Sequence, residues 1–336
     1  MTAEKRRFGC LGIGLIILLA MSALLNLVLL GIQGASHTKI GSSFGEEGPK
    51  FREQTVVPGN SDSKIAVISL KGVISSSTEG TLGDSMVDDM KLALNQAAND
   101  ASVKGVILSV DSPGGEVTAS DIIYHEVTKL RAKKPVVVYM GSLAASGGYY
   151  ISCGGSWIVA NETTLTGSIG VIISTVKYKD LLGKIGVEPM VFKSGKFKDM
   201  LSGSRDMTPE ETAYIQGMVM QTYGKFVGIV AAERHLPEQQ LRDGIADGRV
   251  ISGKDALGDK LINQIGYFED AVAKARELAG VSDAEVVSYK ASAGFGRFLK
   301  MLGKADNAKI EVSLEQQLMP ALEPGRLYML PSYYAP

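Results

Sequence analysis

Ser146 is the residue of this sequence whose surroundings best suit a nucleophile. It lies in the run Ala-Ala-Ser-Gly-Gly at 144–148, directly after the apolar stretch 135–140. A strand that ends in small residues can expose a hydroxyl group at the edge of a sheet. The spacing nearly fits the G-x-S-x-G pattern, with Ala144 in place of the first glycine. Because a serine hydroxyl is a weak nucleophile near neutral pH, it needs a base beside it, and that base decides the chemistry.

Histidine, the usual base, has no evident candidate in this chain. His37 lies close to the N-terminal apolar segment, His125 lies about two turns into a predicted helix, and His235 follows another predicted helix. A Ser-His-Asp triad would need a histidine shortly after Ser146, and residues 149–234 contain none. We interpret the histidines as solvated or structural residues.

A lysine that burial keeps neutral is the other known partner of a catalytic serine. Removal from water disfavours the charged form of an ammonium group and lowers its pKa, which leaves an amine able to accept the serine proton. Such a lysine should lie in an apolar setting near a strand end. The stretch 189–199 offers Lys193, Lys196 and Lys198, and their spacing alone does not choose among them.

Two consecutive glycines, Gly114 and Gly115, follow another predicted strand in the run Asp-Ser-Pro-Gly-Gly at 111–115. Main-chain N–H groups in such a turn can approach a ligand closely and bind an oxyanion, although most Pro-Gly-Gly runs are turns and nothing more. In a parallel sheet this turn and Ser146 emerge at the same carboxyl edge. Gly147, which follows the serine, could supply a second donor.

Alternating strands and helices must position these residues. Apolar runs predict strands at 65–70, 106–110, 136–140 and 157–160. Amphipathic spacing predicts helices at 86–98, 118–131 and 272–279, a short helix after Ser146, and a long helix that a capping box opens at 208–211 and that runs towards 232. The predicted fold class is therefore α/β, with a sheet of mainly parallel strands covered by helices.

The N-terminus carries the signature of a membrane anchor. Lys5, Arg6 and Arg7 precede residues 8–36, which contain no charged residue. This apolar stretch is long enough to cross a bilayer and longer than the apolar region of a cleaved signal peptide. We expect a transmembrane helix at 9–33, with residues 1–8 in the cytoplasm and the remaining chain outside it. Cleavage after the small residues 34–36 is the alternative.

The length, charge and cysteine content of the chain limit its possible functions and domain organisation. The net charge of this 336-residue chain is −1, so its charge does not favour binding to nucleic acid. Its two cysteines are too few for a disulfide framework. We predict a flexible tether at 34–62, a globular extracytoplasmic domain at 63–295 and a C-terminal extension at 296–336. The apolar tail of that extension should dock on its own domain or on a neighbouring subunit.

An ordered set of motifs resembles the signal peptide peptidase A family. The motifs lie at 111–115, 141–150, 166–170, 194–199 and 247–256. The match runs from about residue 64 to residue 285, and the N-terminal anchor agrees with it. The set is specific although no single motif is, and the extreme C-terminus, residues 331–336, follows no pattern that can be mapped onto the family.

The resemblance implies roles for particular residues. It makes Ser146 the nucleophile, Lys198 the general base and Ser168 the residue that orients the lysine. The oxyanion hole would be formed by main-chain N–H groups of the glycines Gly114, Gly115 and Gly147. No metal or cofactor is implied.

The resemblance also implies an architecture and an activity. Family members share the fold of crotonases and of the proteolytic subunit of Clp protease, and they assemble into membrane-facing rings, octameric in the short bacterial form. The implied activity is cleavage of remnant signal peptides and other unfolded apolar peptides outside the cytoplasmic membrane. An acyl-CoA enzyme on the crotonase fold and a non-catalytic membrane scaffold are the alternatives. The predicted anchor argues against the first, and the intact serine, lysine and glycine set argues against the second.

Overall fold

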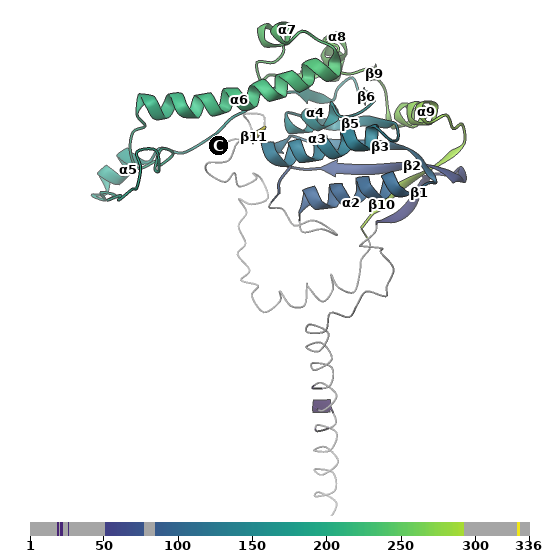
Figure 1. The fold of residues 1–336 in the computed structure, drawn as a ribbon, viewed down its shortest axis with the longest axis horizontal. Helices are drawn as coiled ribbons and strands as arrows, with labels where there is room; N and C mark the ends of the chain where they lie inside the picture. Colours follow the sequence, from purple (N-terminus) through teal and green to yellow (C-terminus); the bar gives the residue numbers. More distant parts are fainter. Residues whose placement is uncertain are drawn as a thin grey trace, which may run out of the picture. The chain divides into compact units, whose positions relative to one another are not determined.

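The computed structural model describes residues 51–76, 85–291 and 328–329, together with Leu19, Met21, Ser22 and Asn26 (Figure 1). The chain divides into the units Met1–Gly48 and Pro49–Pro336, and the following description concerns the second. The predicted segment 1–8, nearly all of the predicted anchor 9–33, and most of the extension 296–336 lie outside the described residues. Within the described residues, no helix has the length and apolar character that crossing a membrane requires.

A sheet of mainly parallel strands is the centre of this unit. Its strands are β1 (Arg52–Val57), β2 (Asn60–Lys71), β3 (Val103–Ser112), β5 (Val136–Ala145), β6 (Trp157–Ala160), β7 (Leu165–Gly167), β8 (Val250–Ser252), β9 (Gln264–Ile265) and β10 (Ala284–Lys290). In the described residues the strand order is β1-β10-β2-β3-β5-β6-β9, with β7 beside β5 and β8 beside β7. Within this sheet, only β1–β10 and β7–β8 pair antiparallel.

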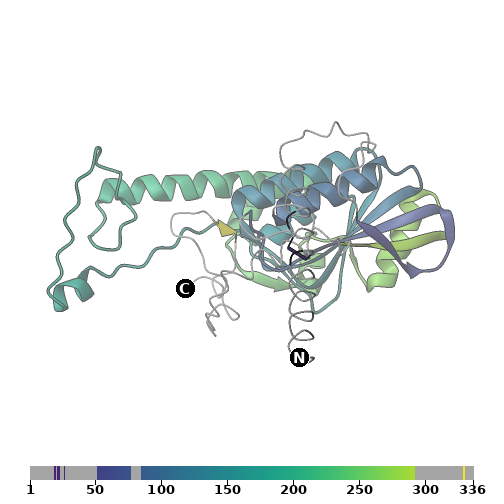
Figure 2. The ribbon, with the colours of Figure 1, turned by 90° about the horizontal axis from the view of Figure 1, so that it is seen from below.

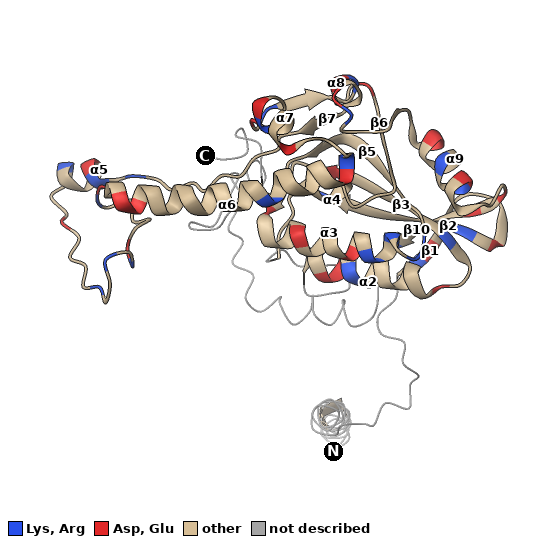
Figure 3. Ribbon diagram, turned by 45° about the horizontal axis from the view of Figure 1, so that its top comes forward, with Lys and Arg blue, Asp and Glu red and all other residues tan. Residues whose placement is uncertain are grey.

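Helices cover both faces of the sheet. The helices of this unit are α2 (Met86–Asn99), α3 (Val117–Arg131), α4 (Gly147–Ser152), α5 (Lys179–Lys184), α6 (Pro209–Arg234), α7 (Glu238–Asp243), α8 (Gly253–Gly258) and α9 (Phe268–Ala279), of which α5 lies away from the sheet. Successive strand residues point to opposite faces. Leu108 and Val138 therefore pack in the core with α2, α3, α4 and α6, whereas Ile107 and Val137 pack with α9. The charged residues of α2, α3 and α9 lie in the outer layers (Figure 3).

The strands predicted at 65–70, 106–110, 136–140 and 157–160 and the helices predicted at 86–98 and 118–131 are confirmed. The mixed α/β class with mainly parallel strands is confirmed as well. The strand β5 runs further than predicted, to Ala145, because its last residues pair with β7 after the β5–β6 pairing ends. This extension delivers Ser146 to the place where β7 ends.

Residues 52–62, assigned from sequence to the tether, instead form β1 and the start of β2. Their side chains are nearly all exposed, so they show no apolar periodicity that could reveal a strand. Main-chain hydrogen bonds to β10 hold these residues in the sheet, and the sequence analysis did not predict β10. The sheet therefore begins about ten residues earlier than the composition indicated.

Residues 174–214, which we call the arm, project from the sheet and its helices (Figures 1 and 2). The arm contains α5 and the first residues of α6, and it returns to the body along the rest of that helix. Large apolar side chains on it are exposed, including Val176, Leu181, Ile185, Met190 and Phe192. Exposed apolar side chains gathered in one segment are typical of a contact surface.

Candidate functional site

Ser146 lies at the junction between β5 and α4 in a strained main-chain conformation. Its φ of +53° and ψ of −115° are values that a residue with a side chain rarely adopts. Its N–H donates to the Gly167 carbonyl at 2.8 Å, and its own carbonyl accepts from the Tyr150 N–H at 2.8 Å. Neighbouring structure therefore holds the serine in a sharp strand-to-helix turn, as a nucleophile turn requires.

The hydroxyl of Ser146 is buried and unpaired. The residue is 0 % exposed, and its Oγ is one of two buried side-chain polar atoms without a hydrogen-bond partner in the described part of the chain. A buried hydroxyl normally finds a partner, because leaving it unpaired costs about 1–3 kcal/mol. An unpaired hydroxyl at a strained turn is typical of a side chain that reacts with a substrate.

The backbones of the three glycines of the predicted oxyanion hole meet beside Ser146. A Cβ placed on Gly114 would lie 2.6 Å from the Gly147 nitrogen, and one placed on Gly147 would lie 3.1 Å from the Gly115 nitrogen. The Gly114 N–H donates to the Ser112 hydroxyl at 3.1 Å. Gly147 opens α4, where main-chain N–H groups have no partner inside the helix. The Gly147 N–H is therefore better placed as an oxyanion donor than that of Gly114, whereas Gly115 is the residue on which the tail strand pairs.

Ser168 is also brought to this place. The strand β7 pairs with the end of β5, with Gly167 opposite Ala145, so the residues that follow each strand are neighbours. Ser168 is 3 % exposed, has a φ of +51°, and donates its N–H to the Arg249 carbonyl at 2.7 Å. Two serines in the left-handed region thus lie side by side at the carboxyl edge of the sheet.

The structure does not bring Lys198 to Ser146 within one chain. Lys198 is exposed on the arm. The arm contacts α6 near Glu211, through the ion pair of that residue with Arg205. Phe226, much further along α6, contacts α4, and its ring centroid lies 5.0 Å from that of Tyr150. The fifteen residues from Glu211 to Phe226 span about 22 Å along the helix axis. The candidate base of one chain is therefore far from the serine of the same chain.

The other candidate bases are engaged or lie elsewhere. Lys193 pairs with Asp199 at 2.7 Å, and Lys196 pairs with Glu210 at 2.6 Å. His125 is exposed on α3 and His235 is exposed at the end of α6, while His37 lies outside the described residues. No group of three or more His, Cys, Asp or Glu residues that could hold a metal occurs in the described part of the chain.

A strand of the chain's own C-terminal tail lies on the glycine turn. This strand, β11 (Tyr328–Met329), pairs antiparallel with β4 (Gly115–Glu116), with Met329 opposite Gly115. On its other side, Tyr328 and Ile172 exchange two main-chain hydrogen bonds of 3.0 Å. Met329 is 1 % exposed. An extended segment therefore fits between β4 and residue 172, beside Ser146.

Gly114 should tolerate no side chain. A Cβ there would lie 2.0 Å from the Met329 carbonyl oxygen and 2.6 Å from the Gly147 nitrogen, and the φ of Gly114 is +103°. We expect Gly114→Ala to lower activity about 10²-fold or more, because displaced N–H groups no longer meet the oxyanion.

Gly72→Ala is the matched control, because Gly72 has a φ of +81° but no atom within 4 Å of its Cβ position. Thermal unfolding and kcat/KM of both variants check the prediction. Equal activity losses in the two variants would show that backbone strain, and not the close approach of the turn, is responsible.

Sequence reasoning missed both the tail strand β11 and the ion pairs that Arg205 makes on the arm. The two-residue strand has no periodicity to detect. The charges Asp199, Arg205 and Glu211 follow one another at intervals of six residues, which is the signal that could have drawn attention to Arg205.

Two family profiles and several known proteins match this chain. The profile described as peptidase family S49 matches residues 128–282, and the Clp protease profile matches residues 71–161. A protein of Enterococcus faecium named "putative signal peptide peptidase SppA" is 37% identical over 302 residues, which cover 85% of each chain. Protease 4 of Salmonella typhi is 40% identical over 236 residues, 69% of this chain and 37% of that protein. The chloroplastic serine protease SPPA of Arabidopsis thaliana is 32% identical over 213 residues, 63% of this chain and 31% of that protein.

Proposed function

This chain belongs to peptidase family S49 and is a serine protease, and on that premise we propose that Ser146 is its nucleophile and Lys198 its general base. Ser146 Oγ attacks the carbonyl carbon of the scissile bond while the lysine amine takes the hydroxyl proton. Main-chain N–H groups of Gly115 and Gly147 stabilise the oxyanion, and Ser168 orients the amine. The proton passes to the leaving amine, and water then hydrolyses the acyl ester on Ser146.

The position of β11 is the observation that best supports a peptide as the substrate. An extended backbone already lies on Gly115–Glu116 beside the serine, held by main-chain pairing. Addition of a strand to a free sheet edge is a common mode of peptide recognition, and it requires an extended segment. A folded protein has its main-chain groups already paired and cannot bind in this way. We therefore propose unfolded apolar peptides, including remnant signal peptides, as substrates.

The distance between Lys198 and Ser146 supports an oligomer in which neighbouring copies share a site. The arm exposes apolar side chains, and residues 212–224 of α6 carry no charge (Figure 3). Such a surface is stabilised when another subunit covers it. We propose that the arm of one copy carries Lys198 to the Ser146 of its neighbour. A closed ring repeats this contact, and we propose an octamer as its size.

We further propose that residues 9–33 anchor the chain in the cytoplasmic membrane. Residues 1–8 then lie in the cytoplasm, 34–50 form the tether, and the peptidase domain from Phe51 to about residue 295 lies outside. The charge pattern around the apolar segment supports this orientation. We also propose that the core shares the crotonase fold, and the Clp protease match over β3 to β6 supports that relationship.

Hydrolysis of a linear peptide tests the proposed function. We expect the full-length chain in detergent to cleave an unstructured apolar peptide, because such a peptide can pair with β4 as β11 does. The same peptide closed into a tight ring should resist cleavage, since it cannot extend. Mass spectrometry of the products measures both rates. Turnover of an acyl-CoA with no cleavage of the linear peptide would refute the proposal in favour of an acyl-CoA enzyme.

A further inference from the structure

The turn that carries Lys198 is tied to α6 through the residues on both sides of the lysine. The Lys198 N–H closes the turn onto the Gly195 carbonyl at 3.1 Å. Lys196 pairs with Glu210, and the Phe197 ring stacks on Tyr214 with centroids 5.3 Å apart. Asp199, which follows the lysine, is held by Arg205. Lys198 itself makes no ion pair with any of the described residues. Its side chain is exposed to solvent, on a turn that its neighbours hold in place.

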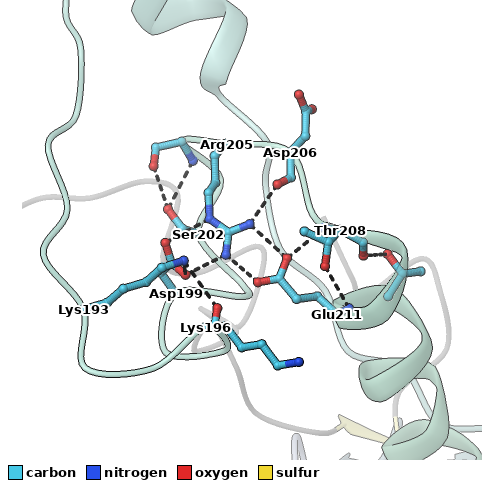
Figure 4. Close-up of polar contacts among 10 residues, drawn as sticks. Lys193, Lys196, Asp199, Ser202, Arg205, Asp206, Thr208 and Glu211 are labelled. Atoms are coloured by element: carbon cyan, nitrogen blue, oxygen red, sulfur yellow. Dashed lines mark hydrogen bonds and ion pairs between the residues drawn. The ribbon is translucent and has the colours of Figure 1, made fainter.

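Arg205 is the centre of this bracing (Figure 4). It donates from Nε and Nη2 to the two carboxylate oxygens of Asp199, at 2.9 and 2.6 Å. It also donates from Nη1 and Nη2 to Glu211, at 2.9 and 2.5 Å. Glu211 is 3 % exposed and accepts the Thr208 N–H at 2.8 Å, which fixes it in the first turn of α6. A planar guanidinium engaged by two carboxylates can hold the turn in one position.

The same contacts neutralise the carboxylate next to Lys198. Asp199 accepts hydrogen bonds from Arg205 and from Lys193, and these cations hold the pKa of Asp199 well below its usual range. The charges of Lys193, Arg205, Asp199 and Glu211 sum to zero. A free carboxylate beside an amine would favour the ammonium form, which cannot act as a base.

Other charged groups around the turn are paired with one another. Glu210 pairs with Lys196, and Asp206 pairs with Lys177 and Lys179. The charged groups near Lys198 on the arm and in the first turn of α6 are therefore Lys177, Lys179, Lys193, Lys196, Asp199, Arg205, Asp206, Glu210 and Glu211. Asp199 is the carboxylate closest to Lys198 along the chain, and Arg205 occupies both of its oxygens.

We propose that Arg205 is a positioning residue for Lys198, which braces its turn against α6 and keeps the Asp199 carboxylate away from its amine. This proposal rests on the proposed function, in which Lys198 is the general base. Arg205 itself touches neither the serine nor the substrate. Its contribution is to keep the amine both correctly placed and available in its neutral form.

The pH dependence of kcat/KM separates this role from a purely structural one. In Arg205→Gln the Asp199 carboxylate keeps Lys193 as a partner but loses Arg205 from both oxygens, so it can also pair with the Lys198 ammonium. The rising limb of the profile should then move to higher pH by about one unit, with an approximately tenfold loss of rate below the limb. Adding Asp199→Asn to that variant removes the carboxylate and should return the limb towards its original position. Lys129→Gln removes an exposed ion pair on α3 and should leave the profile unchanged.

A second measurement does not depend on peptidase activity. The rate at which acetic anhydride acetylates Lys198 at each pH, read by peptide mass spectrometry, should fall in Arg205→Gln at neutral pH and recover in the double variant. Equal acetylation profiles in wild type and Arg205→Gln, or a rate loss that is uniform in pH, would overturn the proposal. A shifted acetylation profile in a chain that cleaves no peptide would instead count against the proposed function.

Discussion

Replacing Ser146 with alanine is expected to abolish peptide hydrolysis, with a fall in kcat on the order of 10⁶-fold. In the proposed mechanism the hydroxyl oxygen forms the covalent bond to the acyl group, and neither the glycine turn nor the lysine can replace it. Burst and steady-state kinetics on a linear apolar peptide measure the loss. The residual rate should reflect oxyanion binding alone.

The fold must be shown to survive this change. Cys153 reports on it, because this thiol is 2 % exposed and burial raises its pKa to about 12, so a thiol reagent reaches it only on unfolding. Ser152→Ala is the matched variant on the same helix. It removes the buried hydrogen bond to the Gly148 carbonyl, at a cost of about 1 kcal/mol, and should keep most activity. A folded Ser146→Ala protein with wild-type turnover would disprove the assignment of the nucleophile.

Replacing Lys198 with alanine should lower kcat/KM by about 10²- to 10⁴-fold, the usual contribution of a general base. Because Lys198 lies on the arm, far from the serine of its own chain, the loss should be recoverable from another copy. We therefore expect co-expression of Lys198→Ala with Ser146→Ala to restore activity that neither variant has alone. In a random equal mixture, about one site in four combines an intact serine with an intact neighbouring lysine.

The mixing experiment needs a neutral variant on the same arm. Lys184 is exposed in α5, and Lys184→Ala should retain near wild-type activity, because an exposed charge there contributes little. Rescue is measured on oligomers purified through tags on both variants. If doubly tagged oligomers are inactive, the lysine does not act across the subunit boundary. Wild-type activity in Lys198→Ala alone would remove it as the base.

Much of the sheet could be predicted because the strands at its centre are buried on both faces. Residues 136–140 form a continuous apolar run and residues 106–110 are apolar except for Ser109, and the structure places both strands at the middle of the sheet. The exposed edge strand β1 and the two-residue strands β4, β9 and β11 escaped prediction. Main-chain pairing supplied by distant segments determines such strands, and their own residues carry no pattern of burial.

The amino-acid sequence by itself determined that a serine between small residues and a pair of glycines end neighbouring parallel strands. Burial dictates those strands, and their parallel order dictates a common edge. Only the tertiary structure decided that Ser168 joins this edge through β7 and that the tail strand lies across it. It also placed Lys198 on the arm, beyond the roughly 22 Å of α6 that separate Glu211 from Phe226. Contacts between segments far apart in the sequence depend on three-dimensional packing, which no local spacing encodes. The lack of a suitably placed histidine pointed to lysine, and the length of α6 supports the proposal that this lysine acts from a second chain.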